Sequence, residues 1–271
     1  MPLLDPAFET VATAYDRNAD KYDEFIENNP NLMRMRQRVY KFITARLPKG
    51  SRILDLACGT GTDAVWFAQN GYSVFGVDIS AEMLERAKQK AKDLNLQDRL
   101  SFEQLSYTDL KDANIGKFDL TFSNFGGLNC VHDLRPMAAF LADRIKPHGK
   151  LILVPMNRWC AWEIGWHLLH LQPRTAFRRL RRDGVEARVG RDSVHVWYPS
   201  IKTLRQTFAP HFQLRRVIGL GVCLPPSYLE PAIAKRPKLS RWLQRFDQLT
   251  RNHWPFSRLA DHVILEFEHA A

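Results

Sequence analysis

The sequence predicts an α/β protein with a doubly wound, mostly parallel seven-stranded sheet, an N-terminal helical cover and an inserted helix plus β-hairpin. Two observations lead to this prediction. Between residues 49 and 157, apolar strand-like runs alternate regularly with helical patterns, which is typical of a parallel sheet covered on both faces. The run Ile53–Leu56 also ends in a glycine turn, residues 57–61, directly before a helical segment. Such a turn brings backbone N–H groups close to a negatively charged ligand.

Residues 1–48 are predicted to form the helical cover. Leu32, Met35, Val39 and Phe42 recur at helical spacing on one face. The sequence Pro48-Lys49-Gly50 then ends the helix before the first strand.

Residues 49–156 are predicted to be a core that binds a nucleotide-like cofactor. The second strand ends in Asp78, and Ser80 suits the N-cap of the next helix. Residues 200–271 complete the sheet and add a helix over residues 239–249. The strands are predicted at 51–57, 73–78, 99–105, 117–123, 149–156, 212–219 and 262–268.

Residues 157–199 interrupt the alternation and are predicted to be a substrate-selecting insertion. Its first part, Trp159–Leu171, is apolar on nearly every side, as in a helix that is buried or lies against an apolar surface. A group of arginines follows, and residues 185–189 and 194–198 alternate as a β-hairpin around residues 190–193. The arginines are Arg174, Arg178, Arg179, Arg181 and Arg182.

Composition narrows the classes of protein. The 45% hydrophobic content and scattered charges are typical of a soluble globular chain. The four cysteines lie far apart, and the N-terminus resembles no signal peptide, so the prediction is cytoplasmic. The formal net charge of +10 suits nucleic acid, an anionic membrane surface or an acidic substrate, or describes a solvated basic face.

Three motifs resemble those of the class I S-adenosylmethionine-dependent methyltransferases, which have a Rossmann-like fold. Residues 55–61 resemble the first motif, residues 76–80 the second and residues 118–125 the fourth. The resemblance covers residues 10–156 and resumes at 263–267. It is specific to the cofactor fold and says little about the substrate.

The resemblance implies S-adenosyl-L-methionine as the cofactor and a set of residues that bind it. The first motif would lie along the methionine part, Asp78 would hold the ribose, and Ile79 and Met83 would contact adenine. The family often has an acid after the third strand, where this chain has Leu105-Ser106-Tyr107, so Ser106 or a backbone carbonyl would replace it. The predicted cofactor residues are Tyr15, Tyr22, Asp55, Ala57, Cys58, Gly59, Gly61, Asp78, Ile79, Met83, Leu105, Ser106, Asn124 and Phe125.

Catalysis of methyl transfer depends mainly on holding the acceptor in line with the sulfonium methyl, and a base is needed only for an acceptor that keeps its proton. His132 and Tyr15 are the predicted catalytic residues. Tyr15 and Tyr22 could equally be packing residues of an amphipathic helix. Trp162, Trp166 and Tyr198 are predicted to contact substrate. Glu163, His167 and His170 share a helix face, but coincidence explains this spacing, and no metal is predicted.

The predicted function is methyl transfer to an oxygen or nitrogen of a partly apolar small molecule, with arginines available to attract its carboxylate or phosphate. Two alternatives stay open: an RNA methyltransferase and a non-catalytic, cofactor-binding regulatory protein. The fourth motif lacks the prolines of DNA-methylating enzymes, so no DNA partner is predicted. A weak contact of Trp159–Leu171 with an anionic membrane competes with a role as pocket wall. The sequence does not indicate an oligomeric state.

Overall fold

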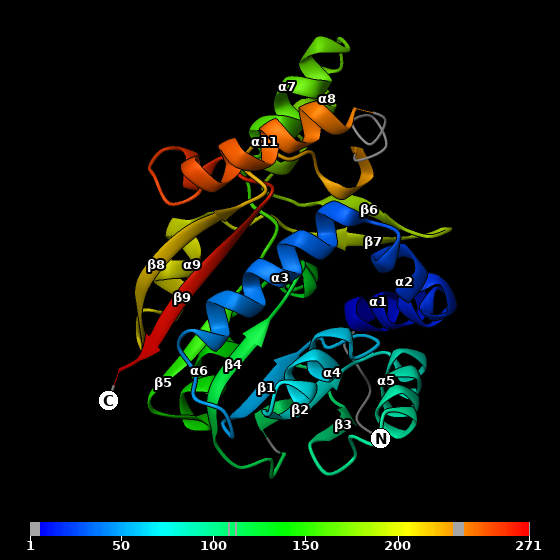
Figure 1. Ribbon diagram of the computed structural model, residues 1–271, viewed down its shortest axis with the longest axis vertical. Helices are drawn as coiled ribbons and strands as arrows, with labels where there is room; N and C mark the ends of the chain where they lie inside the picture. The colour runs from blue at the N-terminus through cyan, green and yellow to red at the C-terminus, as the bar shows by residue number, and fades with distance from the viewer. Residues whose placement is uncertain (1–5, 108, 112, 230–235, 271) are drawn as a thin grey trace.

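The structure is a computed structural model that describes residues 6–270 apart from 108, 112 and 230–235. Its centre is a seven-stranded sheet in the order β3-β2-β1-β4-β5-β9-β8 (Figure 1). The strands are β1 (Arg52–Leu56), β2 (Ser73–Asp78), β3 (Leu100–Gln104), β4 (Phe118–Ser123), β5 (Ile145–Leu153), β8 (Phe212–Leu220) and β9 (His262–His269). The predicted seven-stranded α/β sheet is confirmed.

Strand direction follows the predicted pattern. β1 pairs in parallel with β2 and β4, β2 with β3, and β4 with β5. β9 runs antiparallel to both of its neighbours, β5 and β8. The carboxyl ends of the parallel strands therefore meet at one edge, where open α/β sheets bind their ligands.

Helices cover both faces of the sheet because side chains alternate along each strand. Ile53 points to a core that includes α3 (Pro30–Thr44) and α4 (Thr62–Gln69). Leu54 points to the opposite core, with α6 (Arg135–Arg144) and α9 (Ile201–Phe208). The helix α5 (Ala81–Asp93) begins at Ser80, whose hydroxyl accepts a hydrogen bond from the backbone N–H of Met83. Short turns η1 (Asp109–Lys111) and η2 (Gly127–Cys130) follow β3 and β4.

The N-terminal cover is helical, as predicted, and forms three helices. α1 (Pro6–Asp16) lies against α5 and β7 (Asp192–Val196), while α2 (Ala19–Glu27) leads into α3. In α3, Met35, Val39 and Ile43 are buried against the sheet. The first two helices lie over the carboxyl edge of the sheet (Figure 1), which places their side chains above the glycine turn.

The insertion contains α7 (Ala161–Leu169), α8 (Pro173–Ala176), η3 (Arg178–Leu180) and a separate two-stranded sheet. The hairpin forms as predicted, with β6 (Val185–Val189), but β7 is Asp192–Val196 and therefore starts earlier than expected. Pairing of Val189 with Asp192 leaves a two-residue turn at Gly190 and Arg191, and Gly190 takes a positive φ of 59°.

The C-terminal part contains η4 (Ser227–Leu229), α11 (Pro237–Thr250) and η5 (Phe256–Arg258). α11 contains the helix that was predicted over residues 239–249. The fifth strand, predicted at residues 149–156, is instead Ile145–Leu153, so it begins earlier and shifts register against β4. No described helix is both long and apolar enough to cross a membrane.

Candidate active site

The glycine turn between β1 and α4 has an unusual backbone. Ala57, Gly59 and Gly61 all have positive φ, at 57°, 55° and 73°, a conformation that glycine adopts without steric cost. Ala57 and Gly59 line a pocket, whereas Gly61 faces α5. A Cβ on Gly61 would lie 2.9 Å from the Cβ of Ala87. Gly61 therefore allows the turn to pack on α5 and supports the pocket from behind.

Asp78 at the tip of β2 faces the same pocket. One carboxylate oxygen accepts a hydrogen bond from the backbone N–H of Gly59 at 2.8 Å, and the other accepts one from Ser80 at 3.0 Å. Burial raises the pKa of Asp78, while these backbone donors oppose the increase. An ionised carboxylate has about four lone-pair sites, so Asp78 can still accept hydrogen bonds from two neighbouring hydroxyls of a ribose.

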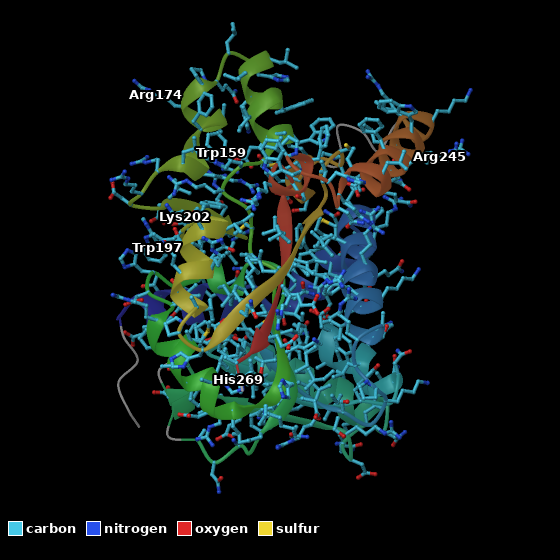
Figure 2. All side chains as sticks on the ribbon, turned by 90° about the vertical axis from the view of Figure 1, so that its left-hand side faces the viewer. Trp159, Arg174, Trp197, Lys202, Arg245 and His269 are labelled. Atoms are coloured by element: carbon cyan, nitrogen blue, oxygen red, sulfur yellow. The ribbon has the colours of Figure 1, made fainter. Side chains whose placement is uncertain are left out.

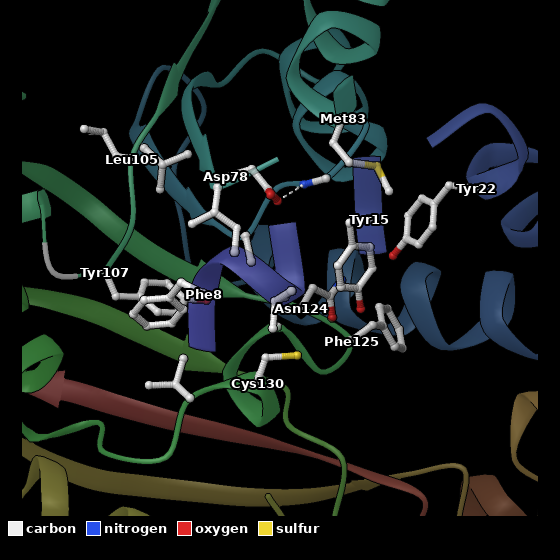
Figure 3. A pocket seen from close by; sticks show the side chains of 17 residues that line it. Phe8, Tyr15, Tyr22, Asp78, Met83, Leu105, Tyr107, Asn124, Phe125 and Cys130 are labelled. Atoms are coloured by element: carbon white, nitrogen blue, oxygen red, sulfur yellow. Dashed lines mark hydrogen bonds between the residues drawn. The ribbon is translucent and has the colours of Figure 1, made fainter. Parts of the chain in front are cut away.

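The pocket lies between the carboxyl ends of β1, β2 and β4 and the helix α1 above them. Figure 3 shows Asp78, Tyr15, Tyr22 and Asn124 around one space. Its lining is mostly apolar with a few polar side chains among them, as in small-molecule sites. We call it the cofactor pocket. It is lined by Phe8, Val11, Tyr15, Tyr22, Ala57, Gly59, Val77, Asp78, Ile79, Met83, Leu105, Tyr107, Asn124, Phe125, Gly127, Cys130 and Val131.

Beneath the pocket lies a cluster of buried charges. Arg36 forms an ion pair with Asp63, which also accepts hydrogen bonds from Tyr40 and, at 3.0 Å, from the amide of Asn124. The buried Oδ2 of Asp55 and the Oδ1 of Asn124 have no hydrogen-bond partner among the described residues.

Unpaired buried acceptors are costly unless a donor meets them. The Asn124 oxygen lines the pocket and suits the ammonium group of a methionine moiety, Asp55 adds a buried carboxyl beside the pocket, and Asp78 suits a ribose. The residues present therefore fit S-adenosylmethionine.

Aromatic side chains close the pocket from above. The rings of Tyr15 and Tyr22 meet edge to face with centroids 6.2 Å apart, and Phe8 and Val11 lie on the same helix as Tyr15. Burial is the main cause that raises the pKa of Tyr15, Tyr22 and Tyr107, so these phenols stay protonated at neutral pH. Burial also raises the pKa of the Cys130 thiol to about 12. The pocket thus offers hydroxyl donors and apolar surface.

Most of the predicted cofactor residues lie together in the cofactor pocket. They are Tyr15, Tyr22, Ala57, Gly59, Asp78, Ile79, Met83, Leu105, Asn124 and Phe125. Asp55, Cys58 and Ser106 are buried beside it and do not line it. The hydroxyl of Ser106 donates a hydrogen bond to the carboxylate of Asp109 at 2.6 Å, within the turn that follows β3. The contact of Ser106 or a backbone carbonyl with adenine stays a prediction.

The other predicted catalytic residue, His132, lies outside the cofactor pocket. It is exposed and lines an adjoining pocket, with its ring 5.2 Å from that of Trp197. Tyr198 lies there too, with Arg158, Arg181 and Arg182. Val131 lines both pockets. We call the second one the arginine pocket. Tyr198 therefore lies in the pocket next to the cofactor pocket, and six of the fourteen residues that line the arginine pocket come from the insertion.

Trp162 and Trp166 line neither pocket. Trp162 donates its indole N–H to the carbonyl of Cys223 at 2.6 Å, which joins α7 to the loop after β8. Trp166 packs on His170 with ring centroids 4.4 Å apart. On the same helix, Glu163 is buried and paired with Arg178 and Arg179 at 2.7 Å each. Part of the predicted arginine group is therefore neutralised inside the protein.

Several pocket residues were not predicted. Phe8, Val11 and Tyr15 occur at i, i+3 and i+7, a spacing that places them on one helix face, so the sequence did hold a signal for Phe8 and Val11. Gly127 approaches Ala57 so closely that a Cβ would lie 2.6 Å from that of Ala57. Cys130 and Val131 had no such signal, since their position depends on how η2 turns.

The fold and the pocket define an α/β domain that binds a nucleotide-containing cofactor at the carboxyl edge of its sheet. Residues 53–149 match the family described as "Methyltransferase domain". This match, together with the relatives and the solved structures described below, supports a class I S-adenosylmethionine-dependent methyltransferase with S-adenosylmethionine as its cofactor.

Among curated proteins, the chain is 30% identical over 173 residues to the ubiquinone/menaquinone biosynthesis C-methyltransferase of Rickettsia massiliae (58% of this chain, 61% of the relative). It is also 30% identical over 129 residues to an S-adenosyl-L-methionine-dependent Diels-Alderase of Talaromyces variabilis (47% and 43%). The chain thus spans less than two thirds of the length of these relatives.

A solved structure of the geranyl diphosphate C-methyltransferase of Streptomyces coelicolor A3(2) has the same fold. Its TM-score is 0.63 at 14% identity, over 98% of this chain and 99% of that one. The likeness therefore concerns the arrangement of the elements along nearly the whole chain.

Proposed function

We propose that the protein transfers the methyl group of S-adenosylmethionine to a nitrogen or oxygen of a partly apolar, anionic small molecule. The observation that supports this most is the continuity of the cofactor pocket. Asp78 and the glycine turn line this pocket together with the rings of Tyr15, Tyr22 and Phe125. A cofactor held by Asp78 and the turn would place its reacting end beside these rings.

Methyl transfer to such an acceptor requires little acid–base catalysis by the protein. When bound, S-adenosylmethionine supplies an electrophilic methyl group. Tyr15 and Tyr22 keep their protons, so they act as hydrogen-bond donors that orient the acceptor. The apolar lining excludes water and favours a fixed approach, which supplies much of the rate of an in-line transfer. Such a site suits an acceptor that already carries a free lone pair, as an uncharged amine or a phenolate does.

The arginine pocket supports an anionic acceptor. Arg181 and Arg182 are exposed there beside Trp197, and Val131 forms the wall shared with the cofactor pocket. We assign selection of the acceptor to residues 157–199, with the reacting atom near Tyr15 and the anionic group near these arginines. His132 would then contact the acceptor, whereas Tyr15 and Tyr22 would lie beside the transferred methyl group.

The test is incubation of the purified protein with methyl-labelled cofactor and fractionated cell extract, followed by mass analysis of the products. The proposal expects one small-molecule fraction to gain a methyl group, and Asp78→Ala to abolish that gain. It would be contradicted if label appeared in RNA, which would favour the RNA methyltransferase alternative.

A second candidate is a cofactor-dependent protein that transfers no methyl group. It is favoured by the lining of protonated phenols and apolar side chains, together with the likeness to an S-adenosyl-L-methionine-dependent Diels-Alderase. Under this candidate, calorimetry would show tight cofactor binding while no extract component gained label.

A further inference from the structure

Apolar side chains gather on the surface formed by α7 and α11. Fourteen large apolar side chains are exposed among the described residues, and eleven of them belong to residues 159–177 and 239–256. Leu169 and Leu171 at the end of α7 are 82% and 89% exposed, and Trp254 is 77% exposed. Figure 1 shows α7, α8 and α11 together at one end of the molecule. We call this surface, residues 159–177 and 239–256, the apical surface.

α11 is attached to the body of the protein by polar contacts. Its buried Asp247 forms an ion pair with Arg38 of α3 and accepts hydrogen bonds from the backbone N–H groups of Val222 and Cys223, at 2.6 and 3.1 Å. This polar anchor fixes which side of the helix faces inward.

The apolar side of α11 consequently faces solvent. Leu239, Trp242, Phe246 and Leu249 follow one another at helical spacing, and all four are exposed. The rings of Trp242 and Phe246 are stacked with centroids 5.5 Å apart. An amphipathic helix that buries its polar side and exposes its aromatic side requires another apolar phase to cover it.

Basic side chains surround this apolar surface. Residues 159–177 and 236–256 hold six lysines and arginines and two carboxylates. Both carboxylates, Glu163 and Asp247, are buried in ion pairs. On α11, Lys238, Arg241 and Arg245 fall beside the apolar sector at helical spacing. Arg174 and Arg245 project from the two sides of this end of the molecule (Figure 2).

We propose that the apical surface docks on an anionic lipid bilayer. Exposed tryptophan, phenylalanine and leucine rimmed by lysine and arginine is the pattern of a helix that lies in the membrane interface. The aromatic rings enter the headgroup region, and the basic side chains pair with anionic lipids. The surface uses no residue that lines the cofactor pocket, so this proposal stands independently of the proposed function.

Co-sedimentation of the full chain with vesicles tests the proposal. At low salt the protein should bind vesicles of phosphatidylcholine and phosphatidylserine (3:1), and bind at least tenfold less to phosphatidylcholine alone. High salt should release it. Trp242→Ser/Phe246→Ser should lower the affinity at least tenfold, and Arg241→Glu/Arg245→Glu should do the same.

Matched controls exist on other surfaces. Phe25 and Leu94 are also exposed, at 53% and 46%, so Phe25→Ser/Leu94→Ser should leave vesicle binding unchanged. Lys88→Glu/Lys92→Glu on α5 makes the same change in charge as the arginine pair and should have less than half its effect. All variants should retain their cofactor affinity, which shows that they are folded.

Three results would overturn the proposal. The first is no binding to the anionic vesicles at low salt. The second is equal binding by the parent chain and Trp242→Ser/Phe246→Ser. The third is a dimer in sedimentation velocity that this double substitution abolishes while vesicle binding persists, because the surface would then contact a second copy of the chain.

Discussion

Asp78 accepts a hydrogen bond at 2.8 Å from the backbone N–H of Gly59. The tip of the second strand is thereby tied to the turn after the first strand, and both line the cofactor pocket. Gly59 has a positive φ of 55° in this turn. One side chain therefore fixes the shape of the turn and keeps acceptor capacity for a ligand.

Asp78→Ala is expected to weaken S-adenosylmethionine binding at least a hundredfold, or about 3 kcal/mol, because a charge-assisted contact to ribose is lost. Titration calorimetry measures the change, and a thermal melt verifies that the variant is folded. Asp93→Ala, an exposed change on α5, is the control and should leave the affinity unaltered. An affinity of Asp78→Ala equal to that of the parent would remove Asp78 from the site.

Tyr15→Phe removes one hydroxyl and keeps the ring that packs against Tyr22. We expect kcat/KM for the acceptor to fall about tenfold, roughly 1.4 kcal/mol of transition-state stabilisation, with cofactor affinity changed less than threefold. Because burial raises the pKa of Tyr15 well above its usual range, the parent enzyme should lose no activity through ionisation of this phenol up to about pH 9.5. Unchanged kinetics in Tyr15→Phe would assign the residue to packing alone.

Arg181→Gln/Arg182→Gln tests the arginine pocket. Both side chains are exposed at this pocket, so their loss should raise KM for an anionic acceptor about tenfold and leave cofactor binding intact. Increasing salt should weaken acceptor binding to the parent more than to the variant. Arg205→Gln, an exposed arginine on α9, serves as the control. If the control raised KM equally, the effect would belong to overall charge.

The sequence predicted the sheet, and it singled out most of the side chains that line the cofactor pocket, because both depend on short local patterns. Asp78 ends an apolar run, and the glycines stand at fixed spacing after another. These local patterns are sufficient to place the residues, because the carboxyl ends of parallel strands meet at one edge of the sheet whatever the rest of the chain does.

The acceptor side was harder to predict, because its residues come together through long-range packing. Trp162 and Trp166 look like pocket walls in sequence, yet the Trp162 indole is bound to Cys223. His132 follows the correct loop but turns toward Trp197. Arg178 and Arg179 look like surface charge until Glu163 is seen between them. Which side of α11 faces inward depended on Asp247 meeting Arg38, a pair too distant in sequence to be read from helical spacing.

Low pH should destabilise the contacts that attach the insertion to the rest of the protein. Arg179 joins Glu163 to Asp261, with 2.7 Å to each carboxylate. Despite burial, Arg179 holds the pKa of Glu163 below its usual range, and His262 together with Arg179 does the same for Asp261. Groups with lowered pKa stabilise the fold above their unfolded value near 4 and lose this effect as pH falls further. The free energy of unfolding should thus drop below about pH 4. Glu163→Gln should flatten that drop in urea titrations, and an unchanged slope would contradict the assignment.

The last prediction concerns the ion pair beneath the cofactor pocket. Arg36 and Asp63 are 4% and 6% exposed. Burial, together with the nearby charge of Asp63, raises the pKa of Asp55. Arg36→Met would leave two buried carboxyls without their cation, and we expect about 3–5 kcal/mol of lost stability in urea unfolding. Arg36→Met/Asp63→Leu removes both charges and should recover at least half of this loss. Arg34→Met on the same helix provides the control for loss of a cation. Equal destabilisation by the single and double variants would mean that packing of Arg36 on Phe125, rather than charge balance, stabilises this part of the fold.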